Sequence, residues 1–189
     1  LETNVGSFAV AKSRGLFGYR RQTGSSMRTT VRTPDGTGSG WAGAAHHDWS
    51  RIEPASLGRI AIDKARRSMN PVAVEPGRYT VVLEPTAVGN LVQLLAGAFN
   101  ARAADEGRSF MSRPGGGTKL GQKIVDERVT LVADPFDPDT PGAPFAGDGL
   151  PTGRRVMIEN GVVKSLAYDR YWAQKQGVEA TGFGGGLKM

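Results

Sequence analysis

The chain has 189 residues, which corresponds to about one to one and a half domains of ~150 residues each. Its 39% hydrophobic and 22% charged residues are ordinary for a globular protein. The absence of cysteine excludes a disulfide framework, a thiol nucleophile and a zinc site built on thiolates. No apolar run approaches 18 residues, and the first residues lack the pattern of a signal peptide. We therefore expect no membrane partner and a soluble, cytoplasmic protein.

The net charge of +6 raises the question of nucleic-acid binding. The excess lies in residues 1–75, which hold 11 Lys/Arg against 6 Asp/Glu. These cations are spread along the sequence, with no dense block and no accompanying stacked-aromatic motif. This spread favours a solvated basic face and makes a nucleic-acid partner the weaker hypothesis. The arginines concerned are Arg14, Arg20, Arg21, Arg28, Arg32, Arg51, Arg66 and Arg67.

The first third of the chain is typical of a β-meander followed by a helix. Short alternating runs over residues 5–50 surround a Pro-Asp-Gly turn at 34–36, in which proline presets φ and glycine accepts positive φ. Apolar residues at helical spacing then predict a helix over 56–69, with Ser56 as its N-cap.

The rest of the chain alternates strand-like runs, helices and glycine-rich loops. The predicted elements in chain order are a buried strand at Tyr79–Leu83, a helix over 86–104, a mobile glycine tip at 115–117, a strand within 125–133, an ordered loop over 134–153, a hairpin over 154–166 around Asn160–Gly161, a short helix over 168–176 and a glycine-rich end at 182–186. The sequence thus predicts an α+β fold with antiparallel sheets and two main helices, divided into domains 1–70 and 71–189.

Two clusters were weighed as metal sites. In His46–His47–Asp48, adjacent side chains on a strand point to opposite faces, and no third ligand is evident. Asp134, Asp137 and Asp139 lack the central glycine and distal glutamate of an EF-hand, so we interpret their Asp-Pro pairs as turn formers. Neither cluster predicts a metal site, and the two histidines do not support a serine–histidine triad.

Several long strings resemble the TldD/PmbA family, whose members are called modulators of DNA gyrase and are linked to zinc-dependent proteolysis. They are PGRYTVVLEP at 76–85, EGRSFMS at 106–112, KLGQKIVDERVTLVADPFDP at 119–138 and DGLPTGRRVMIENGVVKSLAYDRYWAQKQG at 148–177. Residues 1–75 are similar more loosely. Members of the family are much longer, so the resemblance implies an internal fragment that spans the end of an N-terminal domain and the start of a C-terminal one.

The resemblance also implies what is missing. Catalytic members carry His-Glu-x-x-x-His on the helix after the Val-Val-Leu strand, where the histidines bind zinc and the glutamate acts as general base. Here those three positions are Gln93, Leu94 and Ala98. The chain therefore resembles the PmbA (TldE) kind of member, with no catalytic or metal-binding residue and no cofactor of its own.

The partners that the resemblance implies are a TldD-like subunit that carries the zinc, and an unfolded peptide substrate in a cleft beside the helix. A homodimer stays open, as does a different role as a stand-alone regulator that associates with peptides or nucleic acid. Tyr168, Tyr171 and Trp172 are candidate interface residues, because aromatic side chains are favoured anchors. The alternative is that Tyr168 and Trp172, four residues apart, pack the short helix onto its own sheet.

Overall fold

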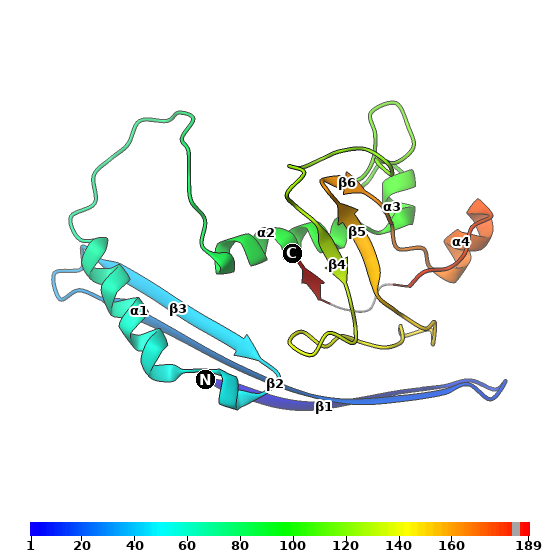
Figure 1. Cartoon of the computed structure of the whole chain (residues 1–189), viewed down its shortest axis with the longest axis horizontal. Helices are drawn as coiled ribbons and strands as arrows, with labels where there is room; N and C mark the ends of the chain where they lie inside the picture. The colour runs from blue at the N-terminus through cyan, green and yellow to red at the C-terminus, as the bar shows by residue number, and fades with distance from the viewer. Residues whose placement is uncertain (183–185) are drawn as a thin grey trace. The chain divides into compact units, whose positions relative to one another are not determined.

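A computed structural model describes residues 1–182 and 186–189, so part of the predicted glycine-rich end lies outside the described residues. The elements are β1 (Glu2–Ala11), β2 (Phe17–Arg32), β3 (Ser39–His46), the 3-10 turn η1 (Trp49–Arg51), α1 (Pro54–Arg67), α2 (Pro85–Ala98), α3 (Ala101–Asp105), β4 (Leu131–Ala133), β5 (Arg155–Glu159), β6 (Val162–Val163), α4 (Arg170–Gln176) and β7 (Leu187–Lys188) (Figure 1). The predicted α+β class with antiparallel sheets and two main helices, α1 and α2, is confirmed.

The chain divides into two compact units. The first contains residues 1–8 and 21–81, and the second contains residues 9–20 and 82–189. The tip of the β1–β2 hairpin belongs to the second unit. There Gly18 packs against Phe145, and Leu16 packs against Gly149. Among the residues that the structure describes, no helix is both long enough and apolar enough to cross a membrane.

The first unit is a three-stranded sheet in the order β1-β2-β3. Strands β2 and β3 pair antiparallel, from Ser25 opposite His46 to Arg32 opposite Ser39. The predicted turn at 34–36 joins them, with Gly36 at a φ of 74° and the Thr33 amide donating to the Gly38 carbonyl at 3.0 Å. The β-meander is therefore confirmed.

Helix α1 covers β3, and glycine makes this close approach possible (Figure 1). A Cβ at Gly40 would lie 2.1 Å from the Ala61 carbonyl oxygen and 2.4 Å from the Ala65 nitrogen. Small residues thus bring the helix backbone onto the strand. The prediction that Ser56 is the N-cap is wrong, because Pro54 already occupies the first turn, where its missing amide costs nothing.

The second unit is a four-stranded antiparallel sheet in the order β6-β5-β4-β7, with α2, α3 and α4 in the same unit. Its buried core contains Phe99, Ala101, Ala104, Met111, Leu131, Ala133, Met157, Ile158, Val163, Leu166 and Trp172. Only residues 131–133 of the predicted strand form β4. The short helix begins at Arg170, because the Asp169 side chain accepts a hydrogen bond from the Trp172 amide at 2.7 Å and caps it.

The hairpin of β5 and β6 turns at the predicted Asn160–Gly161. Both residues have positive φ, 49° and 78°, as a type I′ turn requires. The Gly161 amide donates to the Val129 carbonyl at 2.9 Å, and the Asn160 amide donates to Thr130 Oγ1 at 3.2 Å. The turn is thus fixed from outside the hairpin as well as from within.

Two predicted elements differ from the structure. The helix predicted over 86–104 is two helices, because Asn100 leaves the helical conformation and its side chain caps α3 through the Ala103 amide at 2.8 Å. The strand predicted at Tyr79–Leu83 is not formed. Its side chains are exposed, with Val82 at 98% of its maximal accessibility, and no described residue pairs with its backbone.

Candidate functional groove

A groove of about 750 Å³ lies along α2 and is the candidate functional site of the second unit. Its walls come from the residues just before α2, from one flank of α2 itself and from the end of the chain at β7. The lining is apolar except for one amide side chain, that of Gln93. The complete set is Leu83, Pro85, Val88, Gly89, Val92, Gln93, Ala96, Gly186, Leu187 and Met189.

Helix α2 is anchored on one side only. Val92 and Leu95 pack against the core, whereas Leu91 and Leu94 are 56% and 77% exposed. A helix with apolar residues around most of its circumference is normally buried on more than one side. The apolar surface of α2 is therefore larger than its own unit covers.

The three positions that correspond to the zinc motif are separated by their surroundings. Gln93 lines the groove, Leu94 points to solvent, and Ala98 packs against the core. Together they offer one amide and no imidazole, carboxylate or thiolate, which does not fit zinc. In residues 1–182 and 186–189, no three His, Cys, Asp or Glu side chains gather closely enough to hold a metal ion.

The β7 wall of the groove is held by an ion pair. Lys188 Nζ lies 2.7 Å from Asp137 Oδ2 and 3.8 Å from Asp139 Oδ2, and β7 pairs with β4 through Val132 and Ala133. The hydrogen bond from Lys188, followed by the Thr140 amide, lowers the pKa of Asp137 from 3.8 to about 2. Of the three aspartates weighed as metal ligands, Asp137 and Asp139 therefore pair with Lys188, and Asp134 Oδ2 lies 4.0 Å from Arg154 Nε.

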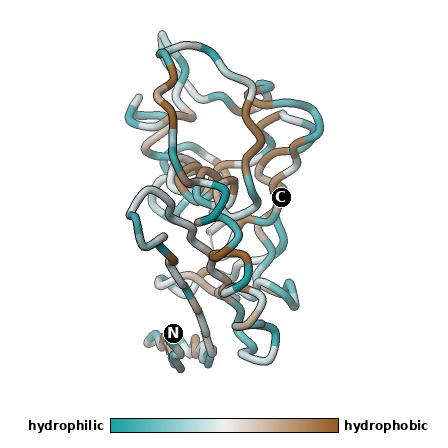
Figure 2. Tube along the Cα trace, turned by 90° about the vertical axis from the view of Figure 1, so that its left-hand side faces the viewer, coloured by the Kyte–Doolittle hydropathy of each residue, from teal (hydrophilic) through white to brown (hydrophobic). Residues whose placement is uncertain are grey.

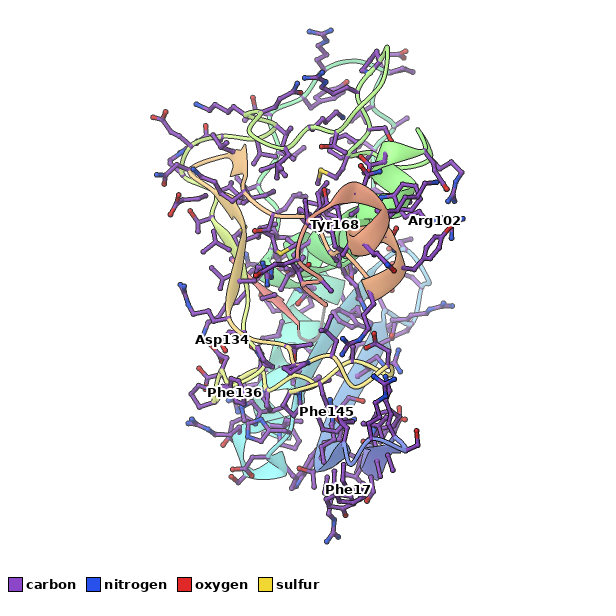
Figure 3. The ribbon with its side chains drawn as sticks, turned by 90° about the vertical axis from the view of Figure 1, so that its right-hand side faces the viewer. Phe17, Arg102, Asp134, Phe136, Phe145 and Tyr168 are labelled. Carbon is purple, nitrogen blue, oxygen red and sulfur yellow. The ribbon has the colours of Figure 1, made fainter. Side chains whose placement is uncertain are left out.

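Asp134 and Asp137 also shape the loop that contains them, of which Figure 3 labels Asp134 and Phe136. Asp134 Oδ1 accepts from the Phe136 amide at 3.0 Å, and Asp137 Oδ1 accepts from the Asp139 amide at 2.9 Å. These are Asx turns, as the turn-former interpretation predicts.

The histidine pair adopts an arrangement that the sequence analysis did not expect. Strand β3 ends at His46, so the rings of His46 and His47 stack with centroids 4.2 Å apart and do not point to opposite faces. The amide of Asp48 donates to His46 Nδ1 at 2.9 Å, while the Asp48 carboxylate accepts from the Ser50 amide and caps η1. The cluster thus ends a strand and begins a 3-10 turn.

The three candidate interface aromatics differ in burial. Trp172 is 5% exposed and belongs to the core, Tyr168 is half-buried against it, and Tyr171 is 62% exposed. Figure 3 labels Tyr168, which lies just before α4, and Arg102, which lies on α3. Burial favours the packing interpretation for Trp172 and leaves Tyr171 as the accessible aromatic of the set.

Some groove residues had no signal in our sequence analysis. Leu187 and Met189 come from the end of the chain, and the pairing of Lys188 with Asp137, which holds this wall, spans 51 positions. The alternation of apolar and charged residues over 187–189 is the only local sign of a strand there.

The comparisons with known proteins agree with this architecture. Residues 1–69 match the model of the PmbA/TldA metallopeptidase central domain, and residues 76–188 match the model of the C-terminal domain of the same family. The chain belongs to the PmbA/TldD family. The sequence resemblance is thereby confirmed.

Relatives by sequence include a metalloprotease of Methanothermobacter thermautotrophicus, 32% identical over 133 residues. That match covers 70% of this chain and 28% of the relative. A metalloprotease of Archaeoglobus fulgidus is 30% identical over 110 residues, which cover 58% of this chain and 25% of the relative. The chain thus spans about a quarter of the length of the curated relatives that it matches.

The solved structures that are similar over nearly the whole chain include the following two. A protein of Bacteroides thetaiotaomicron, described as a candidate modulator of DNA gyrase, has a TM-score of 0.76 at 27% identity, covering 94% of this chain and 40% of that one. TldE from Thermococcus kodakarensis has a TM-score of 0.72 at 25% identity, and the match covers 95% of this chain and 40% of that one.

Proposed function

We propose that this chain is part of a TldE-type, non-catalytic subunit of a TldD/TldE-type metalloprotease complex that acts in proteolysis or peptide maturation. The observation that carries the proposal is the state of α2. The helix and its groove are present, but Gln93, Leu94 and Ala98 provide neither zinc ligands nor a general base. The similarity to TldE supports the same assignment.

In this proposal the partner is a TldD-like subunit, which contributes the zinc and the general base. The groove contributes to binding of an unfolded peptide. Strand β7 is the edge of its sheet in the described part of the chain, and an extended peptide beside it could pair with backbone groups while apolar side chains enter the groove. Backbone pairing recognises extended peptides with little dependence on sequence.

The test is reconstitution of the full protein with a zinc-bearing homologue encoded in the same genome. We expect the two to co-elute, and we expect fluorescein-labelled casein to be cleaved by the complex and not by this protein alone. We also expect less than about one zinc per ten chains in this protein purified without a histidine tag. One tightly bound zinc per chain, or cleavage by this protein alone, would refute the proposal.

A groove variant tests the peptide-binding part separately. Val88→Glu puts a carboxylate into the groove, whereas Ala87→Glu changes the neighbouring exposed residue of the same helix. We expect the first variant to raise KM for labelled casein in the complex and the second to leave KM unchanged. Equal effects would remove the groove from peptide binding while leaving the subunit assignment intact. The cytoplasmic location expected from sequence belongs to the proposal and is checked by cell fractionation.

A further inference from the structure

The sheet of the first unit has one covered face and one open face. On the covered face, Val31, Ala42 and Ala44 belong to the core that α1 closes (Figure 1). Because side chains alternate along a strand, the residues between them point the other way. On this open face of β2 and β3, the register places Arg28, Thr30 and Arg32 opposite Gly43, Trp41 and Ser39. All of these except Gly43 are exposed.

The indole of Trp41 lies against the backbone of Gly43 on the open face. A Cβ added at Gly43 would stand 2.7 Å from Cζ2 and 2.8 Å from Cη2 of the ring, and 3.3 Å from Cγ of Arg28. Glycine therefore leaves the ring and the stem of Arg28 the space that a side chain would fill. Trp41 is still 39% exposed. A ring that rests on backbone and stays accessible offers a π-face for stacking.

The strands that build this face carry the positive charge of the first third of the chain. Residues 1–32 hold six Lys/Arg against one Asp/Glu, whereas residues 33–75 hold five of each. The excess over 1–75 therefore lies entirely in β1, β2 and the turn between them. Near the N-terminus, where β1 begins, the trace in Figure 2 is mostly hydrophilic or neutral in colour.

Two of these cations frame Trp41. Arg28 and Arg32 are four residues apart on the same side of β2, so about 13 Å of strand separates them. Trp41 lies opposite Thr30, midway between them in the register. Neither arginine forms an ion pair with a residue in the described ranges 1–182 and 186–189. The sequence analysis found these cations spread along the chain, and only the pairing of β2 with β3 brings an aromatic ring between two of them.

We propose that this open face binds single-stranded nucleic acid, with a base stacked on the Trp41 indole and flanking phosphates on Arg28 and Arg32. A single strand supplies both an unpaired base and a row of negative charges. In a duplex the bases are stacked on one another and offer no free face to the indole. An acidic peptide would pair with the arginines but leave the ring without a stacking partner. The proposal is independent of the zinc-less subunit role, which concerns α2.

Fluorescence anisotropy of the full protein with a fluorescein-labelled oligothymidylate of about 12 nucleotides tests the proposal. We expect a Kd of about 1–100 μM that weakens as the salt concentration rises. We expect a duplex of equal length to bind at least about 10-fold more weakly, and polyglutamate at equal charge not to displace the oligonucleotide. Absence of binding, equal affinity for the duplex, or displacement by polyglutamate would overturn the proposal.

Variants of the face provide the second measurement. We expect Trp41→Ala to weaken binding about 5- to 150-fold and Trp41→Phe to restore most of the affinity. Joint Arg28→Gln and Arg32→Gln should weaken it at least about 10-fold and lower the slope of log Kd against log salt by about 1.4, for two phosphates. The matched control is joint Arg59→Gln and Arg66→Gln, which removes the same charge from exposed positions of α1 and should change Kd less than about twofold.

Circular dichroism checks that each variant is folded. Equal losses of affinity from the two arginine pairs would overturn the proposal, because they would show attraction to net charge alone. A folded Trp41→Ala variant that binds like the wild type would overturn it as well. If Trp41→Ala does not fold, the two arginine pairs and the comparison with the duplex decide the question.

Discussion

The indole Nε1 of Trp172 donates a hydrogen bond to Asp105 Oδ2 at 2.6 Å and thereby ties α4 to the end of α3. Two cations lie over the same indole, with Arg102 Cζ at 5.5 Å and Lys175 Nζ at 4.7 Å from the ring centroid. Packing, a charge-assisted hydrogen bond and cation–π attraction therefore converge on one side chain.

We predict that Trp172→Ala lowers the free energy of unfolding by about 3–5 kcal/mol, because it empties a buried site and leaves Asp105 without its donor. Tyr171→Ala, which changes the exposed neighbour, should stay within about 0.5 kcal/mol. Denaturant titration measures both. An unchanged stability for Trp172→Ala, with weakened binding to a zinc-bearing partner, would support the interface hypothesis for this residue instead.

Gly40→Ala should destabilise the first unit by about 1–3 kcal/mol or more, because the new Cβ would collide with the backbone of α1. The matched control is Gly58→Ala in α1, where no atom lies within 4 Å of the added Cβ and the better helix propensity of alanine should stabilise by about 0.5–1 kcal/mol. Thermal unfolding followed by circular dichroism distinguishes the two. A neutral Gly40→Ala would contradict the close packing of α1 on β3.

The Lys188–Asp137 pair predicts a pH dependence. The folded-state pKa of Asp137 lies at about 2, below its ordinary 3.8, so ionised Asp137 stabilises the fold above about pH 4 and this contribution is lost as the pH falls through about 2. We expect Lys188→Gln to raise the pKa of Asp137, measured by carboxyl carbon NMR, and to reduce the acid-dependent loss of stability. A pKa that stays at about 2 in this variant would show that the loop amides alone are responsible.

Limited trypsin digestion should cut the 189-residue chain first after Arg78. Residues 72–83 make no backbone–backbone hydrogen bond within the described part of the chain, which is typical of low local stability. The glycine tip at 115–117, which the sequence predicts to be mobile, is closed by the Arg113 amide donating to the Gly117 carbonyl at 2.9 Å, so we expect it to be cut later. Arg78→Gln should abolish the first cut. Initial cleavage after Arg113 or Lys119 would contradict this order.

Local sequence signals were sufficient where the chain stabilises itself over short distances. The turn at 34–36 and the hairpin around Asn160–Gly161 follow from φ preferences of their own residues. The break between α2 and α3 was missed because Asn100 forms a bridge with Ala167, 67 positions away, and a helical period over 86–104 contains no sign of that contact.

The candidate site was predictable only in part, for the same reason. The motif positions on α2 could be assigned from the resemblance, and the loss of ligands at Gln93, Leu94 and Ala98 is evident in the sequence. The opposite wall of the groove could not be predicted, because Leu187 and Met189 reach α2 through tertiary structure alone. The ion pair of Lys188 is a long-range contact of the same kind.

The turn at Asn160–Gly161 also bears on chemical ageing. An asparagine before glycine is prone to deamidation, which begins when the glycine amide nitrogen attacks the asparagine side chain. Here that nitrogen already donates to the Val129 carbonyl, and Gly161 is buried with the Val125 carbonyl oxygen 2.3 Å from where a Cβ would stand. The contacts that fix this turn from outside the hairpin therefore also keep the Gly161 nitrogen from the ring closure, so the native protein should accumulate isoaspartate here more slowly than its unfolded chain.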